Sequence, residues 1–273
     1  MSVQYRLALK EAKRIVIKVG TSSLTHKTGR MNLVRLDRLS MVISELINQG
    51  LEVVLVSSGA IGVGMGKLNF TVRPQAMGIK QALAAIGQCE LMNIYSKMFS
   101  VYNQIVAQVL LTKNDVDDNL KRRNIETTFE HLLEQRVLPI VNENDTIATD
   151  EIRSMDLFGD NDTLSAVVAQ LLHADLLIIL SDIDGFYNAN PKVYPDCMLI
   201  NTVLEITDEL RKCAGGEGSV LGTGGMVTKL NAADIVNNSG IHMVLANGDD
   251  PLIVFNILNG EKVGTLFVGK NKK

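Results

Sequence analysis

Residues 137–165, VLPIVNENDTIATDEIRSMDLFGDNDTLS, bring a short apolar run together with a dense group of carboxylates and amides. The apolar run at 137–141 predicts a buried strand, and a helix is expected to begin at Asn161 or Asp162. The clusters NEND and GDND lie between them, and their side chains can bind amines, hydroxyls and metal-linked waters. Loops at the carboxyl ends of strands in open α/β sheets often hold ligands. We therefore expect a binding site here, with a solvated acidic loop as the alternative.

Two lysines, Lys18 and Lys229, lie at positions where a cation is unfavourable unless an anion is bound nearby. Lys18 lies near the end of the apolar run RIVIKV, and the Gly-Thr-Ser segment that follows offers free N–H groups to an anion. Lys229 ends the glycine-rich segment GTGGMVTK and falls in the first turns of a predicted helix, where the helix dipole disfavours a cation. A bound anion would offset both costs. The alternatives are that Lys18 extends to the protein surface and that the glycine-rich segment is a disordered hairpin.

Two further segments follow predicted strands. SSGAIGVGMG, residues 57–66, predicts a glycine-rich turn whose N–H groups approach an anion, although close helix packing would also explain its glycines. It matches neither the P-loop nor the dinucleotide fingerprint, because Ile61 and Leu68 occupy P-loop positions that need other residues. SDIDGFY, residues 181–187, predicts a tight turn that would contact ribose or a phosphate-bound metal beside a nucleotide.

Hydrophobic periodicity supplies the elements that position these segments. Strands are predicted at 14–19, 52–56, 104–111, 137–141, 175–180 and 241–246, with a short edge strand at 264–268. Helices are predicted at 32–48, 75–99, 119–135, 162–172, 204–213 and 226–238. This alternation is typical of an α/β fold with a largely parallel sheet and helices on both faces. We expect one domain with two lobes, residues 1–172 and 173–273, and all the polar clusters at the carboxyl edge of the sheet.

Composition narrows the function. The net charge of −3 gives no basic field for nucleic acid or a membrane surface. Three isolated cysteines without C-x-x-C spacing indicate reduced thiols, and no signal core or membrane-length run is present, so a cytoplasmic protein is expected. No Ser-His-Asp arrangement or H-E-x-x-H motif is evident. Lysines, glycine-rich N–H loops and carboxylates at one edge instead favour phosphoryl transfer.

The motifs KVGTS, VSSGAI, KQALAAIGQ, LPIVNENDTIAT, FGDNDTLSA, LSDIDGFY and GTGGMVTK follow one another over nearly the whole chain. In this combination the chain resembles the glutamate 5-kinases of the amino acid kinase family. The resemblance implies a three-layer α/β/α sandwich in which the N-terminal lobe binds glutamate and the C-terminal lobe binds the nucleotide. It also implies that the γ-phosphate of ATP, with Mg²⁺, is transferred to the side-chain carboxylate of L-glutamate, the first step towards proline.

The resemblance also assigns roles to residues. Lys18 and Lys229 match the lysines that stabilise the transferring phosphoryl group, and Asp162 matches the carboxylate that holds them. The substrate-binding positions are Ser58, Gly59, Asp145, Asn161 and Asp160. The nucleotide-binding positions are Lys18, Ser181, Asp182, Thr223, Gly224, Gly225, Met226, Val227, Thr228 and Lys229. The backbone N–H of Gly20 is a further expected contact, and Asp162 and Asp182 are candidates for a metal contact whose ligands stay unknown.

The chain ends soon after GTLFV, so a kinase domain without the PUA domain of many members is expected. That departure leaves feedback inhibition by proline open. Members commonly form dimers or tetramers, and the apolar helix at 75–99 is the candidate interface. The alternatives are a related kinase for N-acetylglutamate, aspartate, carbamate or a nucleotide monophosphate, or a nucleotide-binding regulator without catalysis. The acidic loop favours a substrate with a free amine, which N-acetylglutamate lacks.

Overall fold

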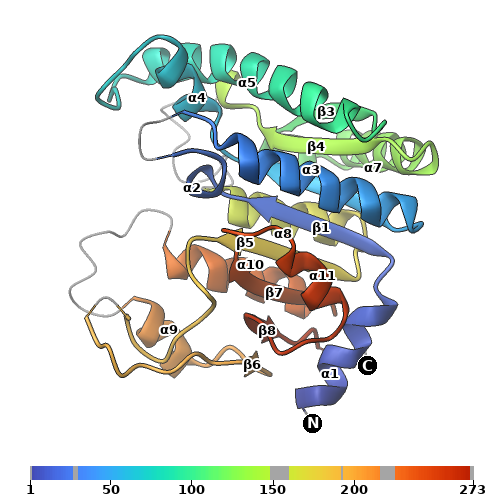
Figure 1. Ribbon diagram of the computed structural model, residues 1–273, viewed down its shortest axis with the longest axis vertical. Coiled ribbons are helices and arrows are strands. Elements are labelled where there is room, and N and C mark those ends of the chain that lie inside the picture. The colour runs from blue at the N-terminus through green and yellow to red at the C-terminus, as the bar shows by residue number, and fades with distance from the viewer. Residues whose placement is uncertain (1, 27–29, 148–159, 192, 216–224, 271–273) are drawn as a thin grey trace. The chain divides into compact units, whose positions relative to one another are not determined.

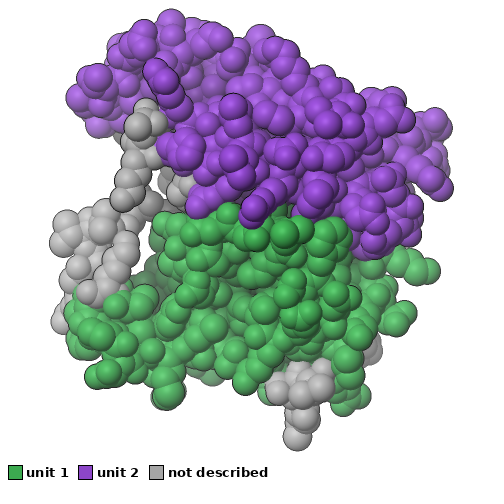
Figure 2. Space-filling model, viewed as in Figure 1, with its two compact units in different colours: residues 1–18, 162–273 green, residues 19–161 purple. Residues whose placement is uncertain are grey.

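The computed structural model describes residues 2–26, 30–147, 160–191, 193–215 and 225–270. The chain forms two compact units (Figure 2): unit 1 consists of Met1–Lys18 and Asp162–Lys273, and unit 2 consists of Val19–Asn161. These units do not coincide with the lobes predicted to meet near residue 173. The lobes were defined by the ligand that each binds, and they stay a prediction.

Unit 2 is built on three parallel strands, in the order β3-β4-β2. They span Val106–Leu111 (β3), Leu138–Glu143 (β4) and Glu52–Ser57 (β2). In β2 and β4 nearly every residue is buried, as the continuous apolar runs of parallel strands require. Because the strands are parallel, their carboxyl ends, with Ser57 and Glu143, lie at the same edge.

Helices cover both faces of these strands, with α3 in front of β4 and α7 behind it in Figure 1. The elements of unit 2 outside the strands are α2 (Thr21–Leu24), α3 (Leu33–Asn48), α4 (Ala60–Lys67), α5 (Met77–Ser100), α6 (Lys113–Asp117), α7 (Asn119–Glu134) and η2 (Asp145–Ile147). The α3 helix begins where the Asn32 side chain accepts a hydrogen bond from the Arg35 N–H, a standard N-terminal cap.

The glycine-rich segment that was predicted as a turn forms the α4 helix, so that prediction was wrong. Its glycines serve the close packing of α4 on α5. A Cβ atom at Gly64 would lie 2.0 Å from the Leu83 carbonyl oxygen, and one at Gly87 would lie 1.7 Å from that of Ala60. Only glycine allows two helix backbones to approach this closely, and the tertiary contact outweighs the low helix propensity of the segment.

Unit 1 carries strands in the order β1-β5-β7-β8-β6. Their bounds are Arg14–Val19 (β1), Leu176–Ser181 (β5), His242–Asn247 (β7), Thr265–Phe267 (β8) and Thr202–Val203 (β6). The β5–β7 pair is parallel, whereas β8 runs antiparallel to β7. The predicted edge strand at the C-terminal end is therefore not an edge, because the two-residue β6 pairs with its other side.

The helices of unit 1 include α11 in front of β7 (Figure 1). They are α1 (Ser2–Ala8), η1 (Leu9–Glu11), α8 (Asn161–Leu171), α9 (Asp208–Ala214), α10 (Met226–Asn238) and α11 (Ile253–Leu258). The predicted helix at 204–213 begins four residues later, because Thr207 caps α9 by accepting from the Leu210 N–H. Within the described residues, no helix is both long and apolar enough for a membrane span.

The longer elements confirm the predicted pattern, with boundaries within two residues for the strands β1 to β5 and β7. The α3, α5, α7, α8 and α10 helices agree equally well. The elements that the pattern missed are short: α1, α2, α4, α6, α11 and β6. A segment of this length contains too few residues to establish a hydrophobic period.

Candidate functional site

Three charged side chains of unit 1 meet at element ends. Lys18 is the penultimate residue of β1, Asp162 is the second residue of α8, and Lys229 is the fourth residue of α10. All three are buried, with 8%, 3% and 7% of their surface exposed. The structure thus brings together three residues that are far apart in the sequence; we refer to them as the Lys–Asp–Lys cluster.

Asp162 is the centre of the Lys–Asp–Lys cluster. The Lys18 ammonium lies 2.6 Å from Oδ1, and the Lys229 ammonium donates to Oδ2 at 3.1 Å. The Thr228 hydroxyl also donates to Oδ2, at 2.9 Å. Each lysine is therefore fixed by a different oxygen of one carboxylate, an arrangement that sets the positions of both ammonium groups.

The electrostatics of the cluster favour an added anion. Burial alone would raise the pKa of Asp162, but the charges of Lys18 and Lys229, with hydrogen bonding, outweigh it and lower this pKa below its ordinary value. Asp162 is therefore ionised at neutral pH. Two ammonium groups around one carboxylate leave one positive charge in excess in a buried place, where charge interactions are strong. A phosphoryl group would supply the missing negative charge.

A second buried polar cluster lies in unit 2, and we call its chain of hydrogen bonds the amide relay. It consists of Gln88 on α5, Asn142 near the end of β4 and Asn161 at the start of α8. Asn142 Nδ2 donates to Gln88 Oε1 at 2.8 Å. Asn161 Nδ2 donates to Asn142 Oδ1 at 2.9 Å and to the Ser57 carbonyl oxygen at 2.8 Å. The relay fixes Asn161, a predicted substrate-binding residue, against the end of β2.

The other predicted substrate-binding residues occupy turns and helix starts. Ser58 follows β2 and its N–H donates to the Val19 carbonyl oxygen at 3.2 Å. Gly59 caps α4 with φ of 104°, a left-handed conformation that glycine adopts without strain. Asp145 begins η2, and burial raises its pKa, an effect that Arg73 partly offsets. Asp160 is half-buried directly before α8.

The predicted nucleotide-binding residues lie at two places in unit 1. Ser181 ends β5 and donates to the Asp182 carboxylate at 3.2 Å, and Asp182 is exposed. Gly225 caps α10, whose first turn carries Met226, Val227 and Thr228. The remaining two predicted residues, Thr223 and Gly224, lie outside the described residues.

The described part of the chain contains no preformed cluster of metal ligands. No group of three or more His, Cys, Asp or Glu side chains there could hold an ion. Lys229 and Thr228 donate to Oδ2 of Asp162, whereas Oδ1 is paired with the Lys18 charge and accepts no hydrogen bond among the described residues, so both oxygens already face a lysine ammonium. Of the two candidates for a metal contact, Asp162 and Asp182, the exposed Asp182 is therefore the better one.

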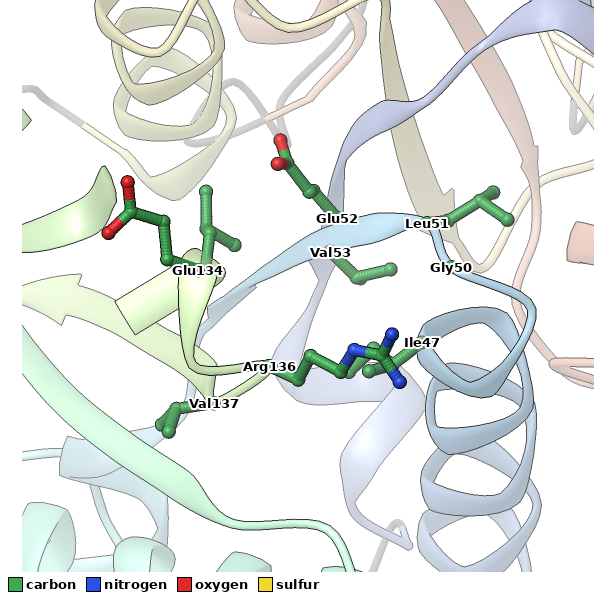
Figure 3. A pocket seen from close by; sticks show the side chains of 9 residues that line it. Ile47, Gly50, Leu51, Glu52, Val53, Glu134, Arg136 and Val137 are labelled. Atoms are coloured by element: carbon green, nitrogen blue, oxygen red, sulfur yellow. The ribbon is translucent and has the colours of Figure 1, made fainter. Parts of the chain in front are cut away.

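A cavity of about 200 Å³ in unit 2 contains none of the predicted site residues. Figure 3 shows it beside Ile47 of α3 and Arg136, which precedes β4. Glu52 and Val53 in its lining are the first residues of β2, so the cavity lies at the amino end of that strand. Ser57 and the amide relay are at the carboxyl end, so this cavity is not the site that the sequence predicted.

Gln88 was not among the predicted site residues, and Asn142 was predicted only as part of the NEND cluster, without a role of its own. Both are buried, with 8% and 3% of their surface exposed, and a buried amide needs hydrogen-bond partners. The signal for Gln88 was available, because the helical period places it in the apolar stripe between Ala84 and Leu91. Asn142 is the penultimate residue of an apolar strand, as Lys18 is.

Solved structures with low sequence identity share this fold. A carbamate kinase from Giardia lamblia bound to AMP-PNP matches with a TM-score of 0.66 and 18% identity, over 96% of this chain and 100% of that chain. A structure of isopentenyl phosphate kinase gives 0.64 and 17%, over 93% and 100%. The predicted class, an α/β/α sandwich with a mostly parallel sheet, is confirmed.

Sequence comparison identifies the family. Residues 13–247 match the Amino acid kinase family. A protein of Clostridium perfringens named glutamate 5-kinase is 56% identical over 97% of this chain and 98% of its own length. Proteins with the same name from Listeria innocua and Enterococcus faecalis are each 53% identical, over 98% and 96% of this chain and 97% of their own lengths. The chain belongs to the amino acid kinase family.

Proposed function

We propose that this protein transfers the γ-phosphate of ATP to the side-chain carboxylate of L-glutamate. The product is γ-glutamyl 5-phosphate, and the reaction is the first step of proline biosynthesis. The Lys–Asp–Lys cluster is the observation that carries the proposal, because it holds two buried ammonium groups and an excess positive charge. Relatives at 51–56% identity that are named glutamate 5-kinase support the choice of substrate.

The chemistry needs charge neutralisation and no general base. A glutamate side chain has an ordinary pKa of about 4.3, so it is already ionised at neutral pH. One carboxylate oxygen attacks the γ-phosphorus, the bond to the β–γ bridging oxygen breaks, and ADP leaves with that electron pair. The obstacle is the repulsion between two anions and the charge that spreads over the phosphoryl oxygens. Positioned cations lower that barrier.

We assign this role to Lys18 and Lys229, and the role of holding them to Asp162. Both ammonium groups are already fixed on Asp162, so little reorganisation is needed when the charge develops. Thr228 donates to the same carboxylate and would help to keep Lys229 in place. In this scheme Asp162 remains ionised and takes no proton, in line with its lowered pKa.

Unit 2 would bind the amino acid. Its candidate contacts are Ser58, Gly59, Asp145, Asn161 and, at the edge of α8, Asp160. Burial raises the pKa of Asp145, and a substrate ammonium beside its carboxylate would restore favourable charge pairing.

Unit 1 would bind ATP. Its candidate contacts are Lys18, Ser181, Asp182, Thr223, Gly224, Gly225, Met226, Val227, Thr228 and Lys229. Mg²⁺ would be held largely by the ATP phosphates, with Asp182 as the candidate protein ligand, since this ion usually binds through phosphates and one or two carboxylates. When bound it would neutralise phosphate charge.

Three further properties complete the proposal. The free cysteines Cys89, Cys197 and Cys213 agree with a cytoplasmic location. The exposed apolar residues Ile79 and Ile86 on α5 support a homo-oligomer, a dimer or tetramer, through this helix. Feedback inhibition by proline, a compact relative of the substrate, is proposed at the same amino acid site.

The experiment is a trapping assay. The protein is incubated with ATP, Mg²⁺ and hydroxylamine, and with L-glutamate, aspartate or N-acetylglutamate in separate reactions. Hydroxylamine converts an acyl phosphate to a coloured hydroxamate, and we expect colour with L-glutamate. If colour forms only with another acid, that acid is the substrate, and the assignment of L-glutamate is wrong. Binding of ATP without any hydroxamate would favour a regulator without catalysis.

A further inference from the structure

The amide relay has a fixed direction, because two backbone groups determine which end of each amide points where. The Glu143 N–H donates to Asn142 Oδ1 at 2.9 Å, and a backbone N–H can only donate. Asn142 must therefore direct its NH₂ group to Gln88, which accepts through Oε1. The Ser57 carbonyl can only accept, so Asn161 must direct its NH₂ group to Ser57 and Asn142.

This direction leaves one atom of Asn161 for a ligand. Its NH₂ group is used twice within the protein, and its Oδ1 has no hydrogen-bond partner among the residues that the structure describes. Asn161 is half-buried, and its Oδ1 is not among the fully buried side-chain atoms that lack a partner in the described part of the chain. An amide oxygen accepts hydrogen bonds and cannot donate, so the ligand group that binds it must carry a hydrogen.

Ionised glutamate offers only one kind of donor. Both of its carboxylates are acceptors, and only its ammonium group carries hydrogens that can be donated. We propose that Gln88 and Asn142 are positioning residues, which hold the Asn161 amide so that Oδ1 accepts from the substrate ammonium. This inference rests on the proposed function, and it explains how a neutral cluster selects substrates that carry a free amine.

Gln88 controls the relay from its far end. If its acceptor were lost, Asn142 Nδ2 would be buried without a partner, and because the Glu143 N–H prevents rotation, the amide could reach another partner or water only by shifting. A shift of Asn142 would weaken its contact with Asn161 Nδ2, so Asn161 would lose one of the two contacts that hold its amide in place. The effect would reach the substrate without a change in any residue that touches it.

The test compares two ligands and three variants by isothermal titration calorimetry. The ligands are L-glutamate and glutarate, which has the same two carboxylates and no amine. Gln88→Met keeps the size of the side chain and removes the acceptor, whereas Gln88→Glu keeps an acceptor oxygen. Tyr95→Phe is the matched control, because it removes another buried hydrogen bond of α5, the 2.8 Å contact with Ser57 Oγ, and leaves all three amides intact.

We expect Gln88→Met to weaken L-glutamate binding about tenfold or more, the usual size of a hydrogen bond to a charged group, and to leave glutarate binding unchanged. Gln88→Glu should restore most of the preference for L-glutamate, and Tyr95→Phe should keep it. An equal loss for both ligands in Gln88→Met would overturn the proposal, because it would indicate a general structural defect. A wild-type protein that binds the two ligands equally well would overturn it too.

The same measurements separate this inference from the proposed function. If the wild-type protein binds L-glutamate as expected and yields no hydroxamate, the proposed reaction fails and the relay is still tested by binding. If it yields hydroxamate and Gln88→Met leaves the preference for L-glutamate intact, the relay fails alone. If L-glutamate does not bind at all, both proposals fail.

Discussion

The Lys–Asp–Lys cluster of unit 1 and the amide relay of unit 2 stabilise buried polar groups in different ways. The first is charged, and one carboxylate compensates two ammonium groups. The second is neutral, and two backbone groups set the direction of its amides. The charged cluster supplies a field that attracts an anion, whereas the neutral one supplies an oriented acceptor. Under the proposed function, the charge of the first cluster serves the transferring phosphoryl group, and the direction of the second serves substrate recognition.

Asp162 of unit 1 and Asp145 of unit 2 differ in the direction of their pKa shifts. Burial would raise the pKa of both, but paired lysines reverse the effect for Asp162, whereas Arg73 only reduces it for Asp145. The carboxylate of Asp162 therefore stabilises the folded protein, and that of Asp145 is held in an unfavourable environment. A carboxylate whose pKa is raised by burial is typical of a binding site.

The largest expected effect comes from removing a lysine of the charged cluster. Lys18→Met keeps the apolar stem and removes the charge, so we expect kcat to fall about 10²–10³-fold while KM for both substrates changes little. Steady-state kinetics with varied ATP and varied L-glutamate will measure both constants. Near-normal turnover in this variant would remove Lys18 from the mechanism.

Asp162→Asn should cause the next largest effect, on stability. The variant keeps the shape and leaves two buried ammonium groups without their counter-charge, which costs about 3–5 kcal/mol when one partner of a buried pair is removed. Urea unfolding at pH 7 will measure the difference. Because the folded pKa of Asp162 is lowered, its contribution is present above the ordinary value of 3.8 and is lost as the pH falls below it.

The acid dependence of Asp162→Asn provides the internal control for this prediction. The gap in unfolding free energy between wild type and variant should narrow as the pH falls below about 4. A variant as stable as wild type at pH 7 would mean that the two lysines do not depend on Asp162.

Asp145→Asn should change the free energy of unfolding less than Asp162→Asn does, and in the opposite direction. Because the folded pKa of Asp145 is raised, its ionised form lowers stability, so the variant should be slightly more stable at pH 7. Its KM for L-glutamate should nevertheless rise about tenfold, through the lost contact with the ammonium group. In the wild type, KM should rise as the pH falls, beginning above 3.8, and the variant should show no such rise. Lower stability together with unchanged KM would contradict this assignment.

Replacing His242 should have the smallest effect, on the way in which the free energy of unfolding depends on pH. It is half-buried in unit 1, burial lowers its pKa, and its Nδ1 accepts from the Gly269 N–H at 3.0 Å. Neutral His242 therefore contributes stability above the ordinary value of 6.5, and this is lost as the pH falls through the lowered folded value. His242→Asn keeps an acceptor and does not titrate, so it should remove about 1 kcal/mol or less of acid sensitivity. Identical urea midpoints for the variant and wild type from pH 7 to 5 would exclude this contribution.

Sequence reasoning found the charged cluster more readily than the neutral one. A lysine at the end of an apolar strand or the start of a helix conflicts with its local surroundings, and the conflict is visible in the sequence at 18 and 229. Gln88 causes no such conflict, since glutamine is a good helix former. Its partner Asn142 lies 54 residues further along, and only the packing of α5 on the strands brings the two together.

The same limit explains the corrections to the fold. The segment at 57–66 contains glycines that are typical of a turn, and the contacts of Gly64 and Gly87 between α4 and α5 decide in favour of a helix. The position of β8 inside its sheet depends on β6, a pair of residues with no pattern of its own. Long periodic segments such as α3 and α10 were predictable because local preference and tertiary packing agree there.

The most direct measurement is a parallel kinetic analysis of Lys229→Met and Gln88→Met with L-glutamate as the varied substrate. The charged cluster is assigned to the transition state and the amide relay to substrate binding. We therefore expect Lys229→Met to lower kcat about 100-fold or more with KM within a few-fold of wild type, and Gln88→Met to raise KM about tenfold with kcat nearly unchanged. If Lys229→Met raised only KM, or if both variants changed kcat and KM in the same proportion, the division of roles between the two clusters would be wrong.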